Sequence, residues 1–484
     1  QPLEPSGQIL MASDDVFYAI TILSSVAVGL IFRYVTGEEI RRLLSTFLGV
    51  GLLYTLCGYH CCHLAITVLG NCILLTLPGL QKKCHVYSYA WNFGYLAVFR
   101  TVHHVGLPAP SAITNAAQLF LTLRMIGLAF DIQDSRRMKK DESSGDAQSQ
   151  DVEQQQLTMK YTHIDPSVKD IVCFSFCYIG NLTGPFYKYH VYRDWLRQRN
   201  PDKIPLWEPL LAKAKDLPVI VVTFLVCSYF FNIQYVQTDE FYTNPFWYRL
   251  FYMVPMFMIF RTRLYSAWLL SECMCITAGF AAYPIASKPK CGAGPTDFKA
   301  LHQTDKEDKV EYDFETVHNL DIWGCELAPM TRQGLRSWNM TVQYWLATYV
   351  HRRVPPSLKP YRVSITMAVS AFWHGIHPGY YLSFLTVPPI LAAEEAMISA
   401  FRKDASPQRQ ALFDWGCWFF KMRGFDYMCM GFLLLKFGAT LRYWHSIYFA
   451  AHVVCAAFFV IGTVGKMMRP KKRDTDKEGV KKQE

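Results

Sequence analysis

Two short strings in the last third of the chain contain the residues best suited to chemistry. Residues 336–343 include Asn339, and residues 370–380 include His374. Both strings lie in apolar surroundings, where an ionisable or amide side chain costs about 2.5–3.5 kcal/mol on insertion scales and usually faces a cavity or a partner. Neutral imidazole is the usual general base near pH 7, and a carboxamide can orient a reactant or donate to developing oxyanion charge. The pair is a candidate for proton abstraction.

The spacing of Asn339 and His374 suggests how they could meet. A Pro-Pro pair at 355–356 lies midway between them, and prolines break helices and favour turns. We expect an antiparallel pair of helices over 337–354 and 357–374. Both side chains would then lie about 25 Å from the turn, at 1.5 Å per residue, and could face one another.

Neither residue requires a catalytic role. A lone helical histidine is commonly a satisfied core histidine, and Asn339 could make an ordinary helix–helix hydrogen bond. Two neighbouring features favour a site at His374. Gly375 is expected to leave room for a ligand, and the Pro-Gly break at 378–379 is expected to leave backbone amides free.

Other catalytic patterns are missing from the sequence. No serine occupies a Gly-x-Ser-x-Gly elbow, and no phosphate-binding glycine loop is present. The fifteen cysteines are scattered, and the densest cluster, residues 60–63, places four successive residues about 100° apart on a helix. We therefore expect no metal site, no cofactor and no covalent serine or cysteine mechanism.

The elements that carry these residues are expected to be membrane helices. The chain is 51% hydrophobic and only 18% charged, which excludes a disordered or coiled-coil protein. Ten to twelve apolar segments, some short and interrupted, approach the roughly 20 residues that a membrane crossing needs. We predict an all-α, polytopic transmembrane helical bundle. Its apolar windows are 16–32, 43–56, 64–80, 86–99, 171–179, 217–233, 246–260, 264–285, 363–372, 380–393, 427–437 and 447–464.

Polar segments divide the rest of the chain. Residues 1–10 are expected to be a non-native or disordered leader, since Met11 resembles a natural start, and 11–466 to form one domain. Within that domain, 131–170 and 287–311 are predicted as polar loops, and 193–216 as an amphipathic interfacial helix. The basic tail 467–484 is predicted to be cytosolic by the positive-inside rule. Together with a net charge of +10, this places basic residues beside lipid and gives no reason to expect nucleic acid.

The two strings resemble the membrane-bound O-acyltransferase family, whose members pair an Asn with an intramembrane His some tens of residues later. The resemblance covers Met11 to about Lys466 and is most marked to members that acylate lysophosphatidylinositol. The strings that carry it are 183–189, 249–284, 338–343, 373–384 and 425–432.

The resemblance implies an intramembrane catalytic chamber in a multi-pass protein of the endoplasmic reticulum. His374 would remove the proton from the sn-2 hydroxyl of lysophosphatidylinositol, and the oxygen would attack the thioester of acyl-CoA, a co-substrate expected to be arachidonoyl-CoA. Asn339 would orient the reactants or hydrogen-bond the carbonyl oxygen. The implied partners are acyl-CoA, lysophospholipid and membrane lipids, and the sequence does not identify protein partners.

Further substrate contacts are expected around this pair. The aromatic and amide candidates for the chamber wall, which could equally be packing residues, are Trp338, Trp373, Tyr380 and Gln343. The basic candidates for phosphate contacts, which could equally be topology signals, are Lys188, Arg193, Arg261 and Arg263.

Three alternatives stay open at this point. A lipid transporter could use His374 and Asn339 to line a translocation path, although the sequence shows no internal repeat. Within the same family, the acceptor could be a secreted peptide or another lysolipid, such as lysophosphatidylcholine or lysophosphatidylserine.

Overall fold

The computed structural model describes residues 13–143, 152–198, 201–304 and 309–468. The predicted leader 1–10 and most of the basic tail, from residue 469, lie outside the described residues. The described chain is mainly helical, with α-helices and short 3₁₀ and π turns, and contains two short strands, β1 (Tyr283–Pro284) and β2 (Tyr312–Asp313), which pair antiparallel. The all-α class predicted from the sequence is confirmed.

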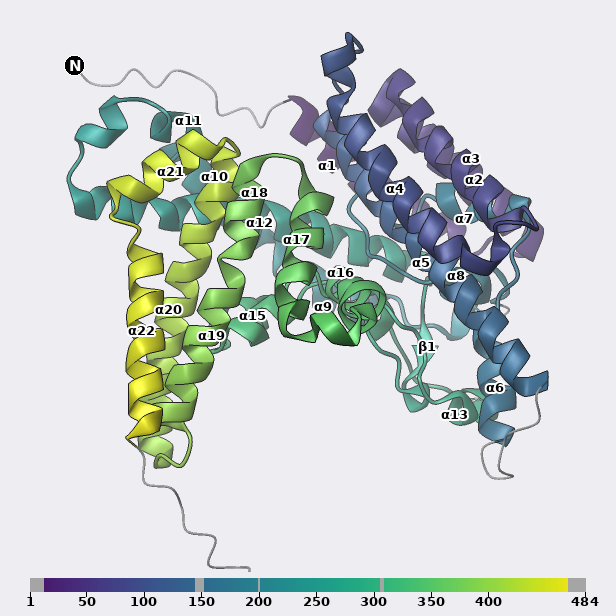
Figure 1. The fold of residues 1–484 in the computed structure, drawn as a ribbon. Helices are drawn as coiled ribbons and strands as arrows, with labels where there is room; N and C mark the ends of the chain where they lie inside the picture. The colour runs from purple at the N-terminus through teal and green to yellow at the C-terminus, as the bar shows by residue number, and fades with distance from the viewer. Residues whose placement is uncertain (1–12, 144–151, 199–200, 305–308, 469–484) are drawn as a thin grey trace, which may run out of the picture.

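The N-terminal helices form one bundle, which lies to the right in Figure 1. Its interior contains polar side chains that satisfy one another: Asn71 Nδ2 donates to Asn92 Oδ1 at 3.1 Å, and Ser88 Oγ donates to Asn71 Oδ1 at 2.6 Å. Such bonds join helices where lipid offers no partner. The helices are α1 (Ser13–Phe32), α2 (Glu38–Cys57), α3 (Cys61–Thr76), α4 (Cys84–Thr101) and α5 (Ala112–Ser143).

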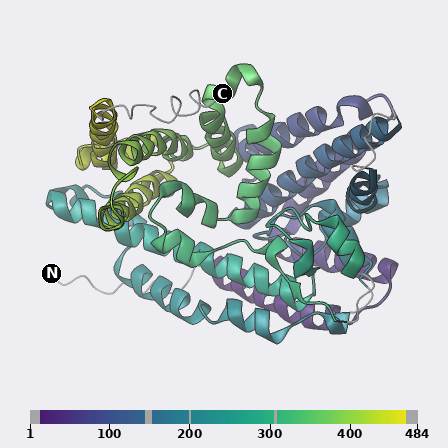
Figure 2. The same cartoon turned by 90° about the horizontal axis from the view of Figure 1, so that it is seen from below.

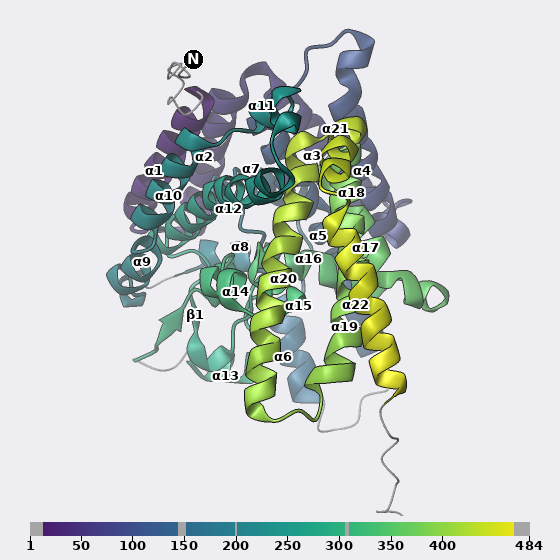
Figure 3. The same cartoon turned by 90° about the vertical axis from the view of Figure 1, so that its left-hand side faces the viewer.

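The C-terminal helices form a second bundle on the opposite side of the molecule, as the view from below also shows (Figure 2). Helices α19, α20 and α22 stand side by side in Figure 3. The helices are α17 (Arg362–His374), α18 (Pro378–Leu385), α19 (Val387–Met397), α20 (Pro407–Leu434), α21 (Phe437–Ser446) and α22 (Ala450–Met467).

Helix α12 (Phe246–Thr277) connects the two bundles, because it packs against α1 and α10 (Leu217–Phe230) and also against α20. The remaining α-helices of the described chain are shorter. They are α6 (Val152–Thr162), α7 (Val168–Phe176), α8 (Tyr189–Leu196), α9 (Trp207–Ala214), α11 (Ile233–Val236), α13 (Phe298–Thr304), α14 (Ile322–Leu327), α15 (Thr331–Ser337) and α16 (Met340–Trp345).

Four helical segments of the described chain are long and apolar enough to cross a membrane: 38–76, 112–140, 378–402 and 450–467. Val16–Phe32 is a shorter apolar helix. Several of these helices present large apolar side chains outward, such as Phe47 at 76% exposed and Phe459 at 49%. Apolar side chains exposed on the outer surface are suited to contact with the hydrocarbon core of a membrane. The figure of ten to twelve membrane segments stays a prediction for the shorter and interrupted windows.

Three of the predicted polar segments are more ordered than expected. The predicted loop 131–170 is largely helical, because α5 continues to Ser143 and is followed by α6 and the start of α7; residues 144–151 lie outside the described chain. The predicted loop 287–311 contains α13. The predicted interfacial helix 193–216 is divided: Trp195 is buried in the core, whereas Trp207 on α9 is 64% exposed.

Candidate active site

Asn339 and His374 line the same cavity, which has a volume of about 400 Å³ and lies among α5, α12, α16, α17, α18 and α20. We call this cavity the chamber. Five of the other predicted contacts lie in its wall: Trp338, Gln343, Trp373, Tyr380 and Arg261. Both strings singled out in the sequence therefore contribute to one cavity.

The backbone at Asn339 has a left-handed conformation, with φ 47° and ψ 55°. It separates α15 from α16, and asparagine tolerates this conformation better than most residues. The carboxamide does not cap α16, and its Oδ1 is buried without a hydrogen-bond partner among the described residues. The helix–helix hydrogen bond considered from the sequence is thus not made by this oxygen, which leaves it available to a ligand.

A buried network holds the loop that precedes Asn339. Asn319 accepts hydrogen bonds from the Met340 amide at 2.8 Å and from the Thr341 hydroxyl at 2.6 Å. Glu272, 1% exposed, accepts from the amides of Asn319 and Leu320 at 2.8 and 3.0 Å. Its other oxygen lies 2.7 Å from Nζ of Lys213. A paired and hydrogen-bonded buried carboxylate makes a firm anchor, so the backbone around Asn339 is fixed from α12.

His374 is the last residue of α17, and aromatic rings surround its imidazole. The ring centroids of Trp373, Phe384 and Phe432 lie 4.6, 5.1 and 5.1 Å from that of the imidazole. Trp373 is itself fixed, because its indole donates to the Leu119 carbonyl at 3.0 Å. The rings restrict the imidazole sterically and leave its nitrogens for other partners.

The predicted helical hairpin is only partly correct. The second helix begins at Arg362, later than the expected 357, and the first begins at Met340, later than the expected 337. The turn between them is a series of tight helical turns rather than a simple break at the prolines: a π-helical turn, Leu346–Val350, is followed by 3₁₀ turns at His351–Arg353 and Pro356–Tyr361.

Both backbone arguments for ligand access at His374 are wrong. A Cβ on Gly375 would lie 2.3 Å from the ring of Tyr380, so the missing side chain makes room for that ring and not for a ligand. The Gly379 amide is not free, since it donates to the Leu435 carbonyl at 2.8 Å. Neither the missing side chain of Gly375 nor the Gly379 amide is therefore available to a ligand.

Of the four basic residues predicted as phosphate contacts, the structure places Arg261 in the chamber wall. It is 5% exposed; its Nε lies 2.9 Å from Glu326 Oε1, and its Nη1 has no hydrogen-bond partner in the described chain. Lys188 instead pairs with Asp131 at 3.1 Å, and Arg193 donates to the carbonyls of His163 and Tyr161. Arg263 lies on the exposed side of α12 and is not part of the chamber lining.

Three residues of this region were not predicted as part of the site. Arg100 directly follows the apolar window 86–99, yet it contacts the backbone at His374. Glu326 and Tyr265 also line the chamber, and the Tyr265 hydroxyl donates to Glu326 Oε1 at 3.1 Å. The sequence signal that could have found these three residues is a polar group next to an apolar run. The residues that they contact, however, are far away in the sequence.

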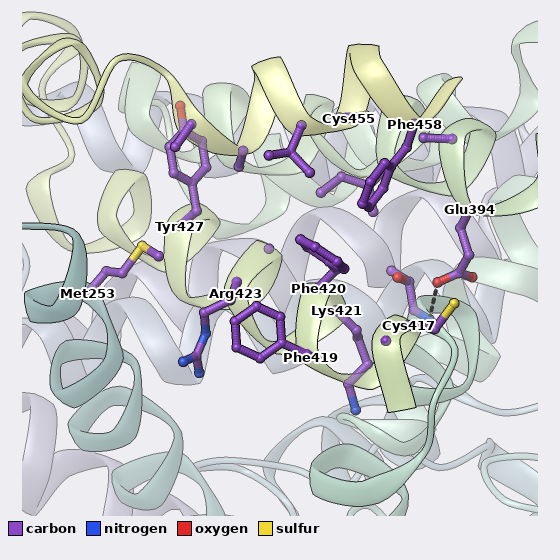
Figure 4. A pocket seen from close by; sticks show the side chains of 18 of the residues that line it. Met253, Glu394, Cys417, Phe419, Phe420, Lys421, Arg423, Tyr427, Cys455 and Phe458 are labelled. Atoms are coloured by element: carbon purple, nitrogen blue, oxygen red, sulfur yellow. Dashed lines mark hydrogen bonds between the residues drawn. The ribbon is translucent and has the colours of Figure 1, made fainter. Parts of the chain in front are cut away.

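A second, larger cavity of about 530 Å³ lies on the other side of α20, among α12, α19 and α22. Its walls are apolar, with Phe420 and Phe458 among the side chains around the space in Figure 4. Two of the charged groups at its edge, Lys421 and Glu394, have hydrogen-bond partners. Lys421 Nζ donates to the carbonyls of Cys325 and Ala328 at 2.8 and 2.7 Å, and Glu394 accepts from the Thr331 amide at 2.7 Å.

With this fold and site in view, comparison with known proteins identifies the class. The model of the membrane-bound O-acyltransferase family matches residues 17–434, so the chain belongs to that family and is an O-acyltransferase of the membrane. The match spans both halves of the molecule and includes Asn339 and His374. A transporter is thereby set aside in favour of an enzyme.

Individual relatives match over nearly their whole length. The membrane-bound acylglycerophosphatidylinositol O-acyltransferase of Xenopus laevis is 43% identical over 471 residues, which cover 97% of each chain. The human protein of that name is 41% identical, over 93% of this chain and 94% of its own. The Drosophila melanogaster one is 34% identical, over 93% and 92%.

Proposed function

We propose that this enzyme transfers an acyl chain from acyl-CoA to the free sn-2 hydroxyl of lysophosphatidylinositol. The support for the acceptor is the near full-length similarity to relatives named as acylglycerophosphatidylinositol O-acyltransferases. The observation that carries the chemistry is the presence of Asn339 and His374 in one largely apolar chamber. The donor is proposed to be a polyunsaturated acyl-CoA, arachidonoyl-CoA above all, and the location the endoplasmic reticulum membrane.

In the proposed mechanism, a nitrogen of the His374 imidazole removes the hydroxyl proton of the lysolipid. The hydroxyl oxygen attacks the thioester carbonyl carbon, and a C–O bond forms as the C–S bond breaks. CoA leaves as a thiolate, which takes the proton back from the imidazolium. The Asn339 carboxamide donates to the carbonyl oxygen as negative charge develops there. The transfer is direct and uses no metal, cofactor or acyl-enzyme.

Arg261 is proposed to contact a phosphate of one of the two substrates. A buried guanidinium with an unpartnered nitrogen is a strong donor to phosphate oxygens. Glu326 holds it at the chamber wall and neutralises part of its charge in the empty site. Trp338, whose ring packs between Phe260 and Trp268, and Gln343 are proposed to line the path of the acyl chain and head group.

An acyl-transfer assay on the purified full chain tests the proposal. Lysophosphatidylinositol, lysophosphatidylcholine, lysophosphatidylserine and a short peptide are each offered with labelled arachidonoyl-CoA and with a saturated acyl-CoA. We expect the inositol lipid and arachidonoyl-CoA to give the highest kcat/KM. Preference for lysophosphatidylcholine would assign the chain to a different acceptor.

A matched pair of histidine variants tests the base in the same assay. His374→Ala should lose roughly 10²–10⁴-fold in turnover, the range that a general base supplies. His445→Ala, on the exposed side of α21, should retain turnover close to that of the wild type. Near-normal turnover of His374→Ala would exclude the assigned base.

A further inference from the structure

A guanidinium from another helix holds the C-terminus of α17. Arg100, near the end of α4, donates from Nη1 to the Phe372 carbonyl at 2.7 Å. Its Nη2 donates to the Trp373 carbonyl at 2.5 Å and to the His374 carbonyl at 3.1 Å. One side chain therefore contacts three successive carbonyl oxygens, the last of which belongs to His374 itself.

These contacts complete the hydrogen bonding of the helix end. The last four carbonyl groups of an α-helix have no partner within the helix. In α17 the Ala371 carbonyl accepts from the Gly375 amide at 3.0 Å, and Arg100 serves the other three. In apolar surroundings an unpaired carbonyl is costly, and a cation is favoured at a helix C-terminus. The end of α17 is thus fixed to α4.

A third helix orients Arg100. Asn115 on α5 accepts from Arg100 Nε at 3.1 Å, and its side chain lies in the chamber wall. One turn further along α5, the Leu119 carbonyl accepts from the Trp373 indole. Helices α4 and α5 pack closely together, so they fix the end of α17 as a unit. The contact joins the N-terminal bundle to the histidine.

Nothing polar holds the imidazole directly. No hydrogen bond to either ring nitrogen of His374 is formed within the described part of the chain, and the ring is confined by aromatic neighbours. In many active sites a carboxylate or carbonyl orients the histidine through its second nitrogen. Here the hydrogen bonds from Arg100 hold the backbone at His374 and not its ring. We propose that Arg100 is the positioning residue of His374, an inference that rests on the proposed function.

The chain offers a matched control for a purely structural arginine. Arg41 is 2% exposed and donates to the carbonyls of Val35, Trp195 and Gln198, far from the chamber lining. Like Arg100, it donates hydrogen bonds to several backbone carbonyl groups, but none of these belongs to α17. If Arg100 only stabilised the fold, Arg100→Gln and Arg41→Gln would have the same consequences.

The test measures kcat, both KM values and thermal unfolding for the purified full chain in lipid nanodiscs. Arg100→Gln should lower kcat about 10- to 100-fold per folded molecule, because a small displacement of a reacting group is costly. The KM values for lysophosphatidylinositol and acyl-CoA should change less than about twofold, since substrate contacts remain. Arg100→Lys should recover part of kcat, because the cation and its donors persist. Arg41→Gln should lose stability with near-normal kcat.

The outcomes separate the positioning role from the proposed function. Wild-type kcat in Arg100→Gln, in an enzyme that His374→Ala inactivates, would overturn the positioning role alone. Equal kcat losses in Arg100→Gln and Arg41→Gln would also overturn it. An enzyme unaffected by His374→Ala would overturn both. If Arg100→Gln does not fold, Asn115→Ala decides: a kcat loss of about threefold or more with both KM values changed less than about twofold supports the role, whereas an unchanged kcat or a loss carried by KM contradicts it.

Discussion

The two cavities on either side of α20 differ in an instructive way. The larger, of about 530 Å³, has apolar walls, and Lys421, Glu394 and Arg423 at its edge each have a partner, although Arg423 Nε makes no hydrogen bond among the described residues. The smaller, of about 400 Å³, contains His374, the unpaired Oδ1 of Asn339 and the unpaired Nη1 of Arg261. Size alone does not distinguish the two cavities. The chamber is distinguished by a histidine together with buried hydrogen-bonding groups of Asn339 and Arg261 that lack partners among the described residues, and such groups are costly unless a ligand satisfies them.

Helix α20 keeps the two cavities apart through its own periodicity. Met422, Phe425, Cys429 and Phe432 line the chamber, whereas Phe420, Arg423, Gly424 and Tyr427 line the larger cavity. Each set recurs every three or four residues, which is the spacing of one helical face. The comparison can thus be tested by substitutions that differ only in the face they occupy.

The largest effect is expected at the carboxamide of Asn339. Glycine adopts a left-handed backbone without strain, so Asn339→Gly removes the amide and preserves the conformation with φ 47°. We expect turnover to fall roughly 10²–10³-fold, as for loss of one oxyanion donor, with little change in thermal unfolding. Asn339→Ala should in addition lose stability, and turnover near that of the wild type in the glycine variant would contradict a catalytic role.

Enlarging one side chain in each cavity should have unequal effects on catalysis. Ala116→Leu adds volume to the chamber from α5, and Ala451→Leu adds the same volume to the larger cavity from α22. We expect kcat/KM to fall about tenfold in the first, because extra methylenes exclude substrate, and to change less than about twofold in the second. A larger loss in Ala451→Leu would show that the larger cavity takes part in turnover.

A smaller effect is expected where Gly375 contacts Tyr380. Gly375→Ala should displace the Tyr380 ring, because the new Cβ would lie 2.3 Å from it, and overpacking of this kind costs about 1–3 kcal/mol. Since this ring lies beside His374, turnover should fall severalfold along with the unfolding temperature. Tyr380→Leu in the same chain should restore stability, and failure to do so would place the clash elsewhere.

The smallest effect on turnover is expected at the edge of the larger cavity. Lys421→Met removes the donor to the carbonyls of Cys325 and Ala328, so stability should fall by about 1–3 kcal/mol. Turnover per folded molecule should stay within about twofold, because Lys421 does not line the chamber. Lys421→Arg, measured by thermal unfolding, should retain most of the stability. A strong loss of turnover in Lys421→Met would weaken the distinction between the cavities.

The sequence was sufficient for the helical class and for bringing Asn339 and His374 to one cavity, because both depend on local signals. Apolar runs predict membrane helices, and a proline pair about midway between the two polar residues predicts that they can meet. Their catalytic roles stay predictions until the variants are measured.

The roles that could not be predicted from the sequence belong to residues whose hydrogen-bond partners are distant in the chain. Lys188 resembled a phosphate contact because its partner Asp131 lies 57 residues earlier in the chain. Arg100 resembled the end of a membrane helix because the carbonyls it serves lie 272 to 274 residues later. Trp195 resembled an interfacial residue because the sequence does not show that its indole donates to the Ala278 carbonyl in the core. Only the folded structure shows which groups these side chains contact.

The left-handed backbone at Asn339 also constrains how the site can vary. A residue that must serve both as a ligand-facing amide and as a kink between α15 and α16 has few substitutes in the amino-acid alphabet. Aspartate keeps the kink and changes the charge, glutamine keeps the amide and loses the kink, and glycine keeps only the kink. The carboxamide in the chamber and the change of chain direction therefore both depend on the residue at position 339. A substitution there changes at least one of them.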